Sequence, residues 1–190
     1  ASSRRGRVLD DVTISADPGV AVVTGRSGCG STTLLRLIAG FHDRQVVRRQ
    51  GVIRLSGRRI DTMSHAELRP QVAVVGHRPT GAMGCGDAER DRVIEELGLR
   101  DWCDRPAARV STCVAARMAL AEGISSGAPV LLLDQLLAPM TSKWRPRVAA
   151  CVVQVARTGR IVLWAEHALD YACLLYTSDA ADDTTCVDLG

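Results

Sequence analysis

Apolar residues gather in short runs separated by amphipathic stretches, and this alternation predicts a sheet covered by helices. The runs are VAVV at residues 20–23, VAVV at 72–75, VLLL at 130–133 and IVLW at 161–164, which is the last strand we expect. Such runs fit buried strands but are too short for helices. A looser alternation over residues 8–15 predicts one more strand. Strands that alternate with helical patterns indicate an α/β fold with a mostly parallel sheet.

The stretches between these runs carry helix start and stop signals. Helices are expected over residues 32–39, 64–68, 87–98, 114–124 and 147–156, with Ser64, Asp87 and Ser111 as N-caps and Gly40, Gly98 and Gly159 near the C-terminal ends. Residues 52–60 predict a hairpin, which would form a small antiparallel side sheet. Three glycines within residues 80–86 predict a loop.

Composition and charge exclude several classes of protein. Three Trp, two Tyr and one Phe leave a core made of Val, Leu, Ile and Ala. The net charge is only +3 and acids are mixed among the arginines, so we expect no nucleic-acid partner. Seven cysteines without a C-x-x-C pair favour neither a disulfide framework nor a zinc site, and a reducing cytosol fits best. No apolar run approaches the roughly 18 residues of a membrane-spanning helix, so no direct membrane insertion is expected.

The stretch between the first apolar run and the first helix has the pattern of a phosphate-binding loop. In such a loop, backbone N–H groups and the dipole of the following helix surround phosphate oxygens. The pattern G-x-x-x-x-G-K-[ST] is matched at Gly25, Gly30 and Thr32, but Ser31 occupies the lysine position. The candidate phosphate-binding residues are Gly25, Arg26, Ser27, Gly28, Cys29, Gly30, Ser31, Thr32 and Thr33.

A candidate metal ligand lies at the end of the most apolar strand, where Asp134 follows residues 130–133. Mg²⁺ on a bound nucleotide prefers oxygen ligands, and the Asp134 carboxylate and the Thr32 hydroxyl could share one ion. The plain alternative is that Asp134 caps the strand end.

Taken in order, these features resemble the ATP-binding cassette (ABC) ATPases, the nucleotide-binding subunits of ABC transporters, over residues 8–172. LLRLIAG at residues 34–40 is similar to the family's helix after the phosphate loop, and VLLLD at 130–134 to its Walker B strand. His167 resembles the switch histidine that contacts the γ-phosphate. EHALD at residues 166–170 is most similar to the energy-coupling-factor importers of vitamins and metal ions.

The resemblance implies a P-loop NTPase fold with ATP and Mg²⁺ as ligands. It implies two partners, a second ABC ATPase subunit in a homo- or heterodimer and a transmembrane permease. The subunit would lie in the cytoplasm, peripherally at the inner face of the cell membrane, and ATP binding would be coupled to solute transport. Residues 78–113 would form the family's helical subdomain in a shortened form.

The departures from the family pattern fall on functional positions. Ser31 replaces the phosphate-binding lysine, His77 the glutamine that senses magnesium, and Gln135 the glutamate that polarises the attacking water. In the family's signature Ser111 is kept, but Thr112 and Cys113 replace its two glycines. In the dimer-interface loop, Thr141 replaces an aspartate. The resemblance therefore gives Gln135 and His167 the catalytic positions and Ser111 and His77 nucleotide contacts.

These departures predict weak binding and poor hydrolysis. Without the lysine, the phosphates lose a charge-assisted contact worth roughly 1.5–3 kcal/mol. Gln135 can hold a water but cannot accept its proton. The alternative is a non-catalytic module that heterodimerises with an active ABC ATPase. Gene decay or sequence error would also explain the departures, whereas a small-molecule kinase does not explain the order of residues 130–135 and His167.

The last residues differ in character from the rest of the chain. CLLYTSDAAD at residues 173–182 resembles the translation of a transposase adapter used in sequencing libraries. We therefore expect residues 1–172 to form the nucleotide-binding domain and residues 173–190 to be a non-native tail that packs poorly. A genuine acidic C-terminal tail is the alternative.

Overall fold

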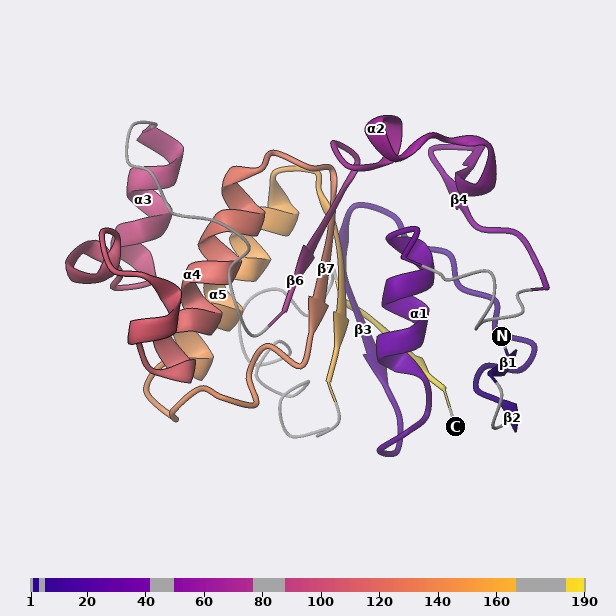
Figure 1. The fold of residues 1–190 in the computed structure, drawn as a ribbon, viewed down its shortest axis with the longest axis horizontal. Helices are drawn as coiled ribbons and strands as arrows, with labels where there is room; N and C mark the ends of the chain where they lie inside the picture. Colours follow the sequence, from indigo (N-terminus) through magenta and orange to yellow (C-terminus); the bar gives the residue numbers. More distant parts are fainter. Residues whose placement is uncertain (1, 4–5, 42–49, 77–87, 167–183, 190) are drawn as a thin grey trace.

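The computed structural model describes residues 2–3, 6–41, 50–76, 88–166 and 184–189, in which a five-stranded sheet is covered by helices on both faces (Figure 1). The strand order is β6–β7–β8–β3–β9, and every pairing is parallel. The strands are β3 (Gly19–Thr24), β6 (Val72–Val75), β7 (Val130–Asp134), β8 (Ile161–Ala165) and β9 (Thr184–Asp188). The expected α/β fold with a parallel sheet is confirmed.

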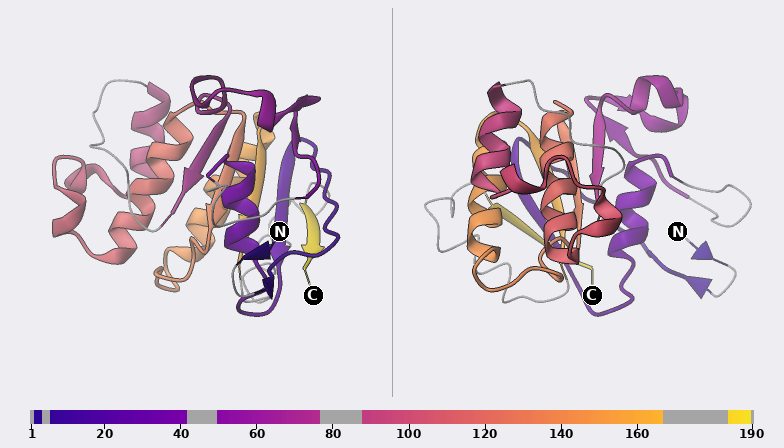
Figure 2. Two further views of the ribbon diagram at one scale, coloured as in Figure 1. Left: turned by 45° about the vertical axis from the view of Figure 1, so that its right-hand side comes forward. Right: turned by 60° about the vertical axis from the view of Figure 1, so that its left-hand side comes forward.

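Helices form one layer on one face of the sheet and two layers on the other. On one face, α1 (Ser31–Ile38) packs against β7 and β8. On the other, α4 (Thr112–Ser125) and α5 (Arg145–Arg157) lie on the sheet, and α3 (Ala88–Glu96) packs outside them (Figures 1 and 2). No helix in the described ranges is both long and apolar enough to cross a bilayer.

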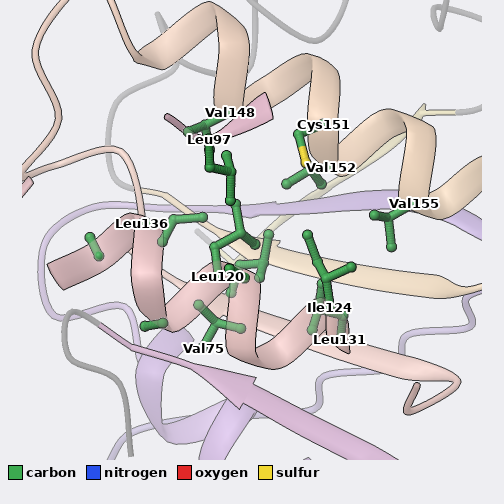
Figure 3. Packing of buried hydrophobic residues seen from close by; sticks show 14 of the residues in the cluster. Val75, Leu97, Leu120, Ile124, Leu131, Leu136, Val148, Cys151, Val152 and Val155 are labelled. Carbon is green, nitrogen blue, oxygen red and sulfur yellow. The ribbon is translucent and has the colours of Figure 1, made fainter. Parts of the chain in front are cut away.

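Alternate residues of β7 enter two separate hydrophobic clusters, one on each face. Leu131 and Leu133 belong to the cluster under α4 and α5, part of which Figure 3 shows. Val130 and Leu132 belong to the cluster under α1. Because side chains alternate across a strand and both faces of β7 are covered, every position must be apolar. This double burial explains why the sequence has a continuous apolar run here.

The small elements lie outside the main sheet. They are β1 (Ser2–Ser3), β2 (Gly6–Arg7), β4 (Arg54–Leu55), β5 (Arg58–Arg59), α2 (His65–Leu68) and the 3₁₀ turns η1 (Ile60–Thr62), η2 (Arg100–Trp102) and η3 (Ala107–Arg109). β4 and β5 form the expected antiparallel hairpin. Its turn residues Ser56 and Gly57 have φ of 47° and 78°, as the tight turn of a two-residue hairpin requires.

The predicted helix caps are confirmed where the structure describes them. The Ser111 hydroxyl accepts a hydrogen bond from the Val114 N–H at 3.3 Å. Ser64 forms a reciprocal capping box with Glu67, whose carboxylate accepts from the Ser64 N–H at 2.9 Å. The helix end at Gly40 also agrees with the sequence, because this glycine has a left-handed φ of 75°. The expected cap Asp87 and the loop over residues 80–86 lie outside the described residues.

Two expectations about strands are wrong. Residues 8–15 form no strand, because Asp11 adopts a left-handed φ of 46° that interrupts extended backbone. The run at residues 161–164 is not the last strand, because β9 follows it and pairs with β3. Thr184–Asp188 thus form a strand within the expected tail, and the interpretation of residues 173–190 as a non-native tail stays a prediction. Residues 173–183 lie outside the described residues.

Candidate phosphate-binding site

Residues 25–30 connect β3 to α1 at the carboxyl edge of the sheet, at the lower edge of Figure 1. Because the strands are parallel, β7 and β8 end at this same edge. Asp134 ends β7, and Glu166 directly follows β8. Ligands of open α/β sheets bind at the carboxyl ends of the strands. The topology therefore brings the candidate loop and two carboxylates to one edge.

The loop has the shape of a phosphate cradle, and Gly30 accounts for part of it. Gly30 has a φ of 97°, and a Cβ there would lie 2.8 Å from Leu9 Cδ2 and 2.8 Å from the Val8 carbonyl oxygen. Only glycine fits such a position. At Gly28, with a φ of 89°, a Cβ would meet nothing within 4 Å, so the space beside it is open. The Cys29 N–H donates to the Arg26 carbonyl at 2.9 Å and closes a turn.

The N-terminus of α1 keeps its positive end. No side chain caps it, and its first turn contains no acidic residue. The first N–H groups of the helix and the positive end of its dipole therefore face the loop, and no acidic side chain of the first turn competes with phosphate for them. The backbone chemistry that binds phosphate is present although Ser31 has no charge. The Ser31 side chain itself is only 3% exposed.

Thr32 and Asp134 meet across the interface between α1 and β7. The Thr32 hydroxyl donates a hydrogen bond to Asp134 Oδ1 at 2.9 Å. A hydroxyl oxygen and a carboxylate oxygen at this separation suit Mg²⁺, which takes oxygen ligands from one or two protein groups and fills its other positions with water and phosphate. These two side chains are therefore the residues that could hold the ion.

Gln135 directly follows Asp134 in an unusual backbone conformation. Its φ is 51°, in the left-handed region that few non-glycine residues adopt. Its N–H donates to the Ala165 carbonyl of β8 at 2.8 Å. The residue expected to lie next to the attacking water is thus fixed at the edge of the sheet, beside the Thr32–Asp134 pair.

One further candidate residue, Ser111, lies away from the loop, and two others fall outside the described residues. Ser111 lies at the start of α4, and α4 packs on the opposite face of the sheet from α1 (Figure 1). His77 and His167 lie outside the described residues. The roles of these three residues stay predictions.

Sequence reasoning missed Glu166 as a site residue, although its side chain is only 4% exposed. Its Oε1 accepts hydrogen bonds from the Leu137 N–H at 2.8 Å and from Trp164 Nε1 at 3.0 Å. An acid that directly follows an apolar strand was the available signal, because ligands of open α/β sheets bind at the carboxyl ends of the strands.

Comparison with known proteins assigns the family. A profile described as "ABC transporter" matches residues 9–138. The chain belongs to the ABC transporter family. It is 29% identical to the molybdenum import ATP-binding protein ModC of Paramagnetospirillum magneticum, over 88% of this chain and 51% of that protein. It is 33% identical to the aliphatic sulfonates import ATP-binding protein SsuB 1 of Frankia alni, over 88% of this chain and 62% of that protein. The chain thus spans between half and two thirds of the length of these two relatives.

Solved structures of ABC proteins share the fold. A bacterial Atm1-family ABC exporter with ATP bound matches with a TM-score of 0.79 and 20% identity, over 100% of this chain and 36% of that chain. A dimeric ATP-binding cassette bound to ADP and Pi matches with a TM-score of 0.72 and 17% identity, over 88% of this chain and 83% of that chain. At these identities the likeness concerns the fold alone, and it confirms the P-loop NTPase class.

Proposed function

We propose that this chain is the ATP-binding domain of an ABC import system. The Thr32–Asp134 hydrogen bond beside the uncapped start of α1 is the observation that carries the proposal. The names of relatives support it, since they are import ATP-binding proteins for molybdenum, aliphatic sulfonates and taurine. A second ATPase subunit and a membrane permease would be its partners, which would hold it at the inner face of the cell membrane. The energy-coupling-factor type is a finer proposal that rests on residues 166–170 alone.

The residues of the site have separate tasks in this proposal. Backbone N–H groups of residues 26–32 bind phosphate oxygens, and Thr32 and Asp134 hold Mg²⁺, which would neutralise charge on the phosphates. The Gln135 amide can hold a water in place but has no group to take its proton. His167 would contact the γ-phosphate, and Ser111 the nucleotide of the partner subunit. We therefore propose a degenerate copy that binds ATP and hydrolyses it poorly.

A non-catalytic module that pairs with an active ABC ATPase is the second candidate. The neutral first turn of α1 favours it, because Ser31 and its neighbours in that turn supply no cation to the phosphate position. This module would bind little or no nucleotide.

Titration with a fluorescent ATP analogue separates the two candidates. Ser31→Lys should raise the affinity roughly tenfold or more if the rest of the cradle is intact. Asp134→Ala should remove the part of the affinity that depends on Mg²⁺. The matched control is Asp17→Ala, which removes an exposed carboxylate ahead of β3 and should change nothing. Absence of binding by both the natural chain and Ser31→Lys would favour the non-catalytic module.

A further inference from the structure

The segment that leaves β7 is tied to the end of β8 at two successive points. The Gln135 N–H donates to the Ala165 carbonyl at 2.8 Å. Two residues later, the Leu137 N–H donates to Glu166 Oε1 at 2.8 Å. The first tie is an ordinary continuation of the parallel ladder. The second uses the side chain of residue 166, so it depends on the residue type at that position.

Glu166 also connects this segment to the strand that leads into the phosphate loop. Its N–H donates to the Val23 carbonyl of β3 at 3.1 Å. Its carboxylate accepts from the Trp164 indole, whose side chain is 1% exposed. One residue thus links the end of β3, the end of β8 and the segment after β7. These are the elements that carry the phosphate loop, the His167 position and Gln135.

A carboxylate that is 4% exposed needs a reason, since removing a charged group from water is costly unless several donors compensate. The conformation of Gln135 supplies one. A left-handed backbone at a non-glycine residue is strained by about 1–2 kcal/mol and persists only when its surroundings hold it. The Gln135 N–H makes the first hydrogen bond, and Leu137, two residues later, makes the second. Loss of the second would therefore let this strain relax and move the Gln135 side chain.

We propose that Glu166 is a positioning residue that holds Gln135 in its left-handed conformation and thereby fixes the group facing the terminal phosphate. The inference rests on the proposed function, because it assumes that ATP binds at residues 25–33. It predicts a specific defect: without the Glu166 carboxylate, the site should lose its preference for ATP over ADP. ADP, which lacks that phosphate, should bind as before.

The test compares the ATP and ADP affinities of the full chain, measured with Mg²⁺ in competition against a fluorescent ATP analogue. Glu166→Ala should lower the ratio of ATP to ADP affinity about fivefold, because the strain at Gln135 is no longer opposed. Glu166→Gln should restore most of the ratio, since its amide oxygen can still accept from the Leu137 N–H. A ratio that is unchanged in Glu166→Ala would overturn the inference.

Two control variants separate positioning from stability. Trp164→Phe removes the second donor but leaves the Leu137–Glu166 bond, so it should lower the melting temperature and keep the ratio. Glu67→Ala removes the carboxylate of the α2 capping box and should also keep the ratio. A ratio that falls equally in Trp164→Phe would mean that any loss of packing has this effect, and it would refute a specific role for Glu166.

Amide hydrogen exchange tests the tie without nucleotide. Glu166→Ala should speed exchange at Leu137 about tenfold and at Gln135 to a lesser degree, with rescue by Glu166→Gln. Unchanged exchange would overturn the inference even if nucleotide binds. If the natural chain binds neither ATP nor ADP, the proposed function fails, and Glu166 has no role in distinguishing ATP from ADP. Fast exchange in Glu166→Ala would then show only that the Leu137–Glu166 hydrogen bond holds this segment.

Discussion

Replacement of Arg117 by methionine should destabilise the fold strongly, because this arginine joins three elements inside the protein. Its side chain projects from α4 and is 4% exposed. Nη1 donates to the Leu97 carbonyl at 2.5 Å and to the Gly98 carbonyl at 3.4 Å, just beyond the end of α3. The guanidinium lies 3.7 Å from the centre of the Trp144 ring, which directly precedes α5.

The size of the effect follows from these contacts. A hydrogen bond from a charged group contributes about 1.5–3 kcal/mol, and a partly desolvated cation–π contact about 1–2 kcal/mol. Burial opposes them: it lowers the pKa of the Arg117 guanidinium, although contact with Cys113 raises it. Methionine avoids the cost of removing a charge from water, but it leaves the Leu97 carbonyl without the Arg117 donor. We expect a loss of about 3 kcal/mol, or a melting temperature about 6–12 °C lower for a chain of this size.

Thermal and urea unfolding, followed by circular dichroism, measure this loss. The matched control is Arg105→Met, since Arg105 lies 4.9 Å from the Trp102 ring but is exposed. The control should change the free energy of unfolding by less than about 0.5 kcal/mol. If Arg117→Met were no more destabilising than Arg105→Met, the reasoning from burial and hydrogen bonding would be refuted.

Two further predictions concern α4 and α2. Gly123→Ala should lower the urea midpoint, although alanine favours helix. The new methyl would lie 3.2 Å from Leu131 Cδ1 and closer still to Val75 Cγ2, so it would overpack the core. A higher midpoint would contradict this packing argument. Glu67 should lose its capping contribution only in acid: hydrogen bonds from the Ser64 N–H and hydroxyl, then Arg58, lower its pKa to about 2. Its contribution is therefore full above the unfolded pKa of about 4.3 and disappears as the pH falls towards 2. A carboxyl NMR signal of Glu67 that titrates near pH 4.3 would disprove this, and Glu67→Gln should lack the acid-dependent loss.

The sequence predicted the elements whose pattern arises from burial on both faces. Residues 130–133 form a strand because Val130 and Leu132 lie in one cluster and Leu131 and Leu133 in the other. The Thr32–Asp134 contact also followed from the loop pattern and the strand-end acid. Local conformation was harder to predict. A single left-handed residue, Asp11, removed the strand expected over residues 8–15.

Contacts between distant side chains left little trace in the sequence. No pattern in the sequence predicts the Leu137–Glu166 hydrogen bond, because its donor is a backbone N–H in a loop. Arg117 had a weak signal, since it is a lone cation among small apolar residues of α4. β9 was missed because Thr184–Asp188 is too polar for a buried strand, and its assignment depends on the free side of β3.

The order of the strands has a consequence for how the chain folds. β3 (Gly19–Thr24) pairs with β8 and β9, and both of these neighbours come much later in the sequence. During synthesis β3 therefore stays without a strand partner until β8 has left the ribosome. Such non-local pairings slow folding and leave an apolar strand open to other chains. We expect slow folding and a dependence on chaperones, which would be greatest for any shortened chain that lacks β8.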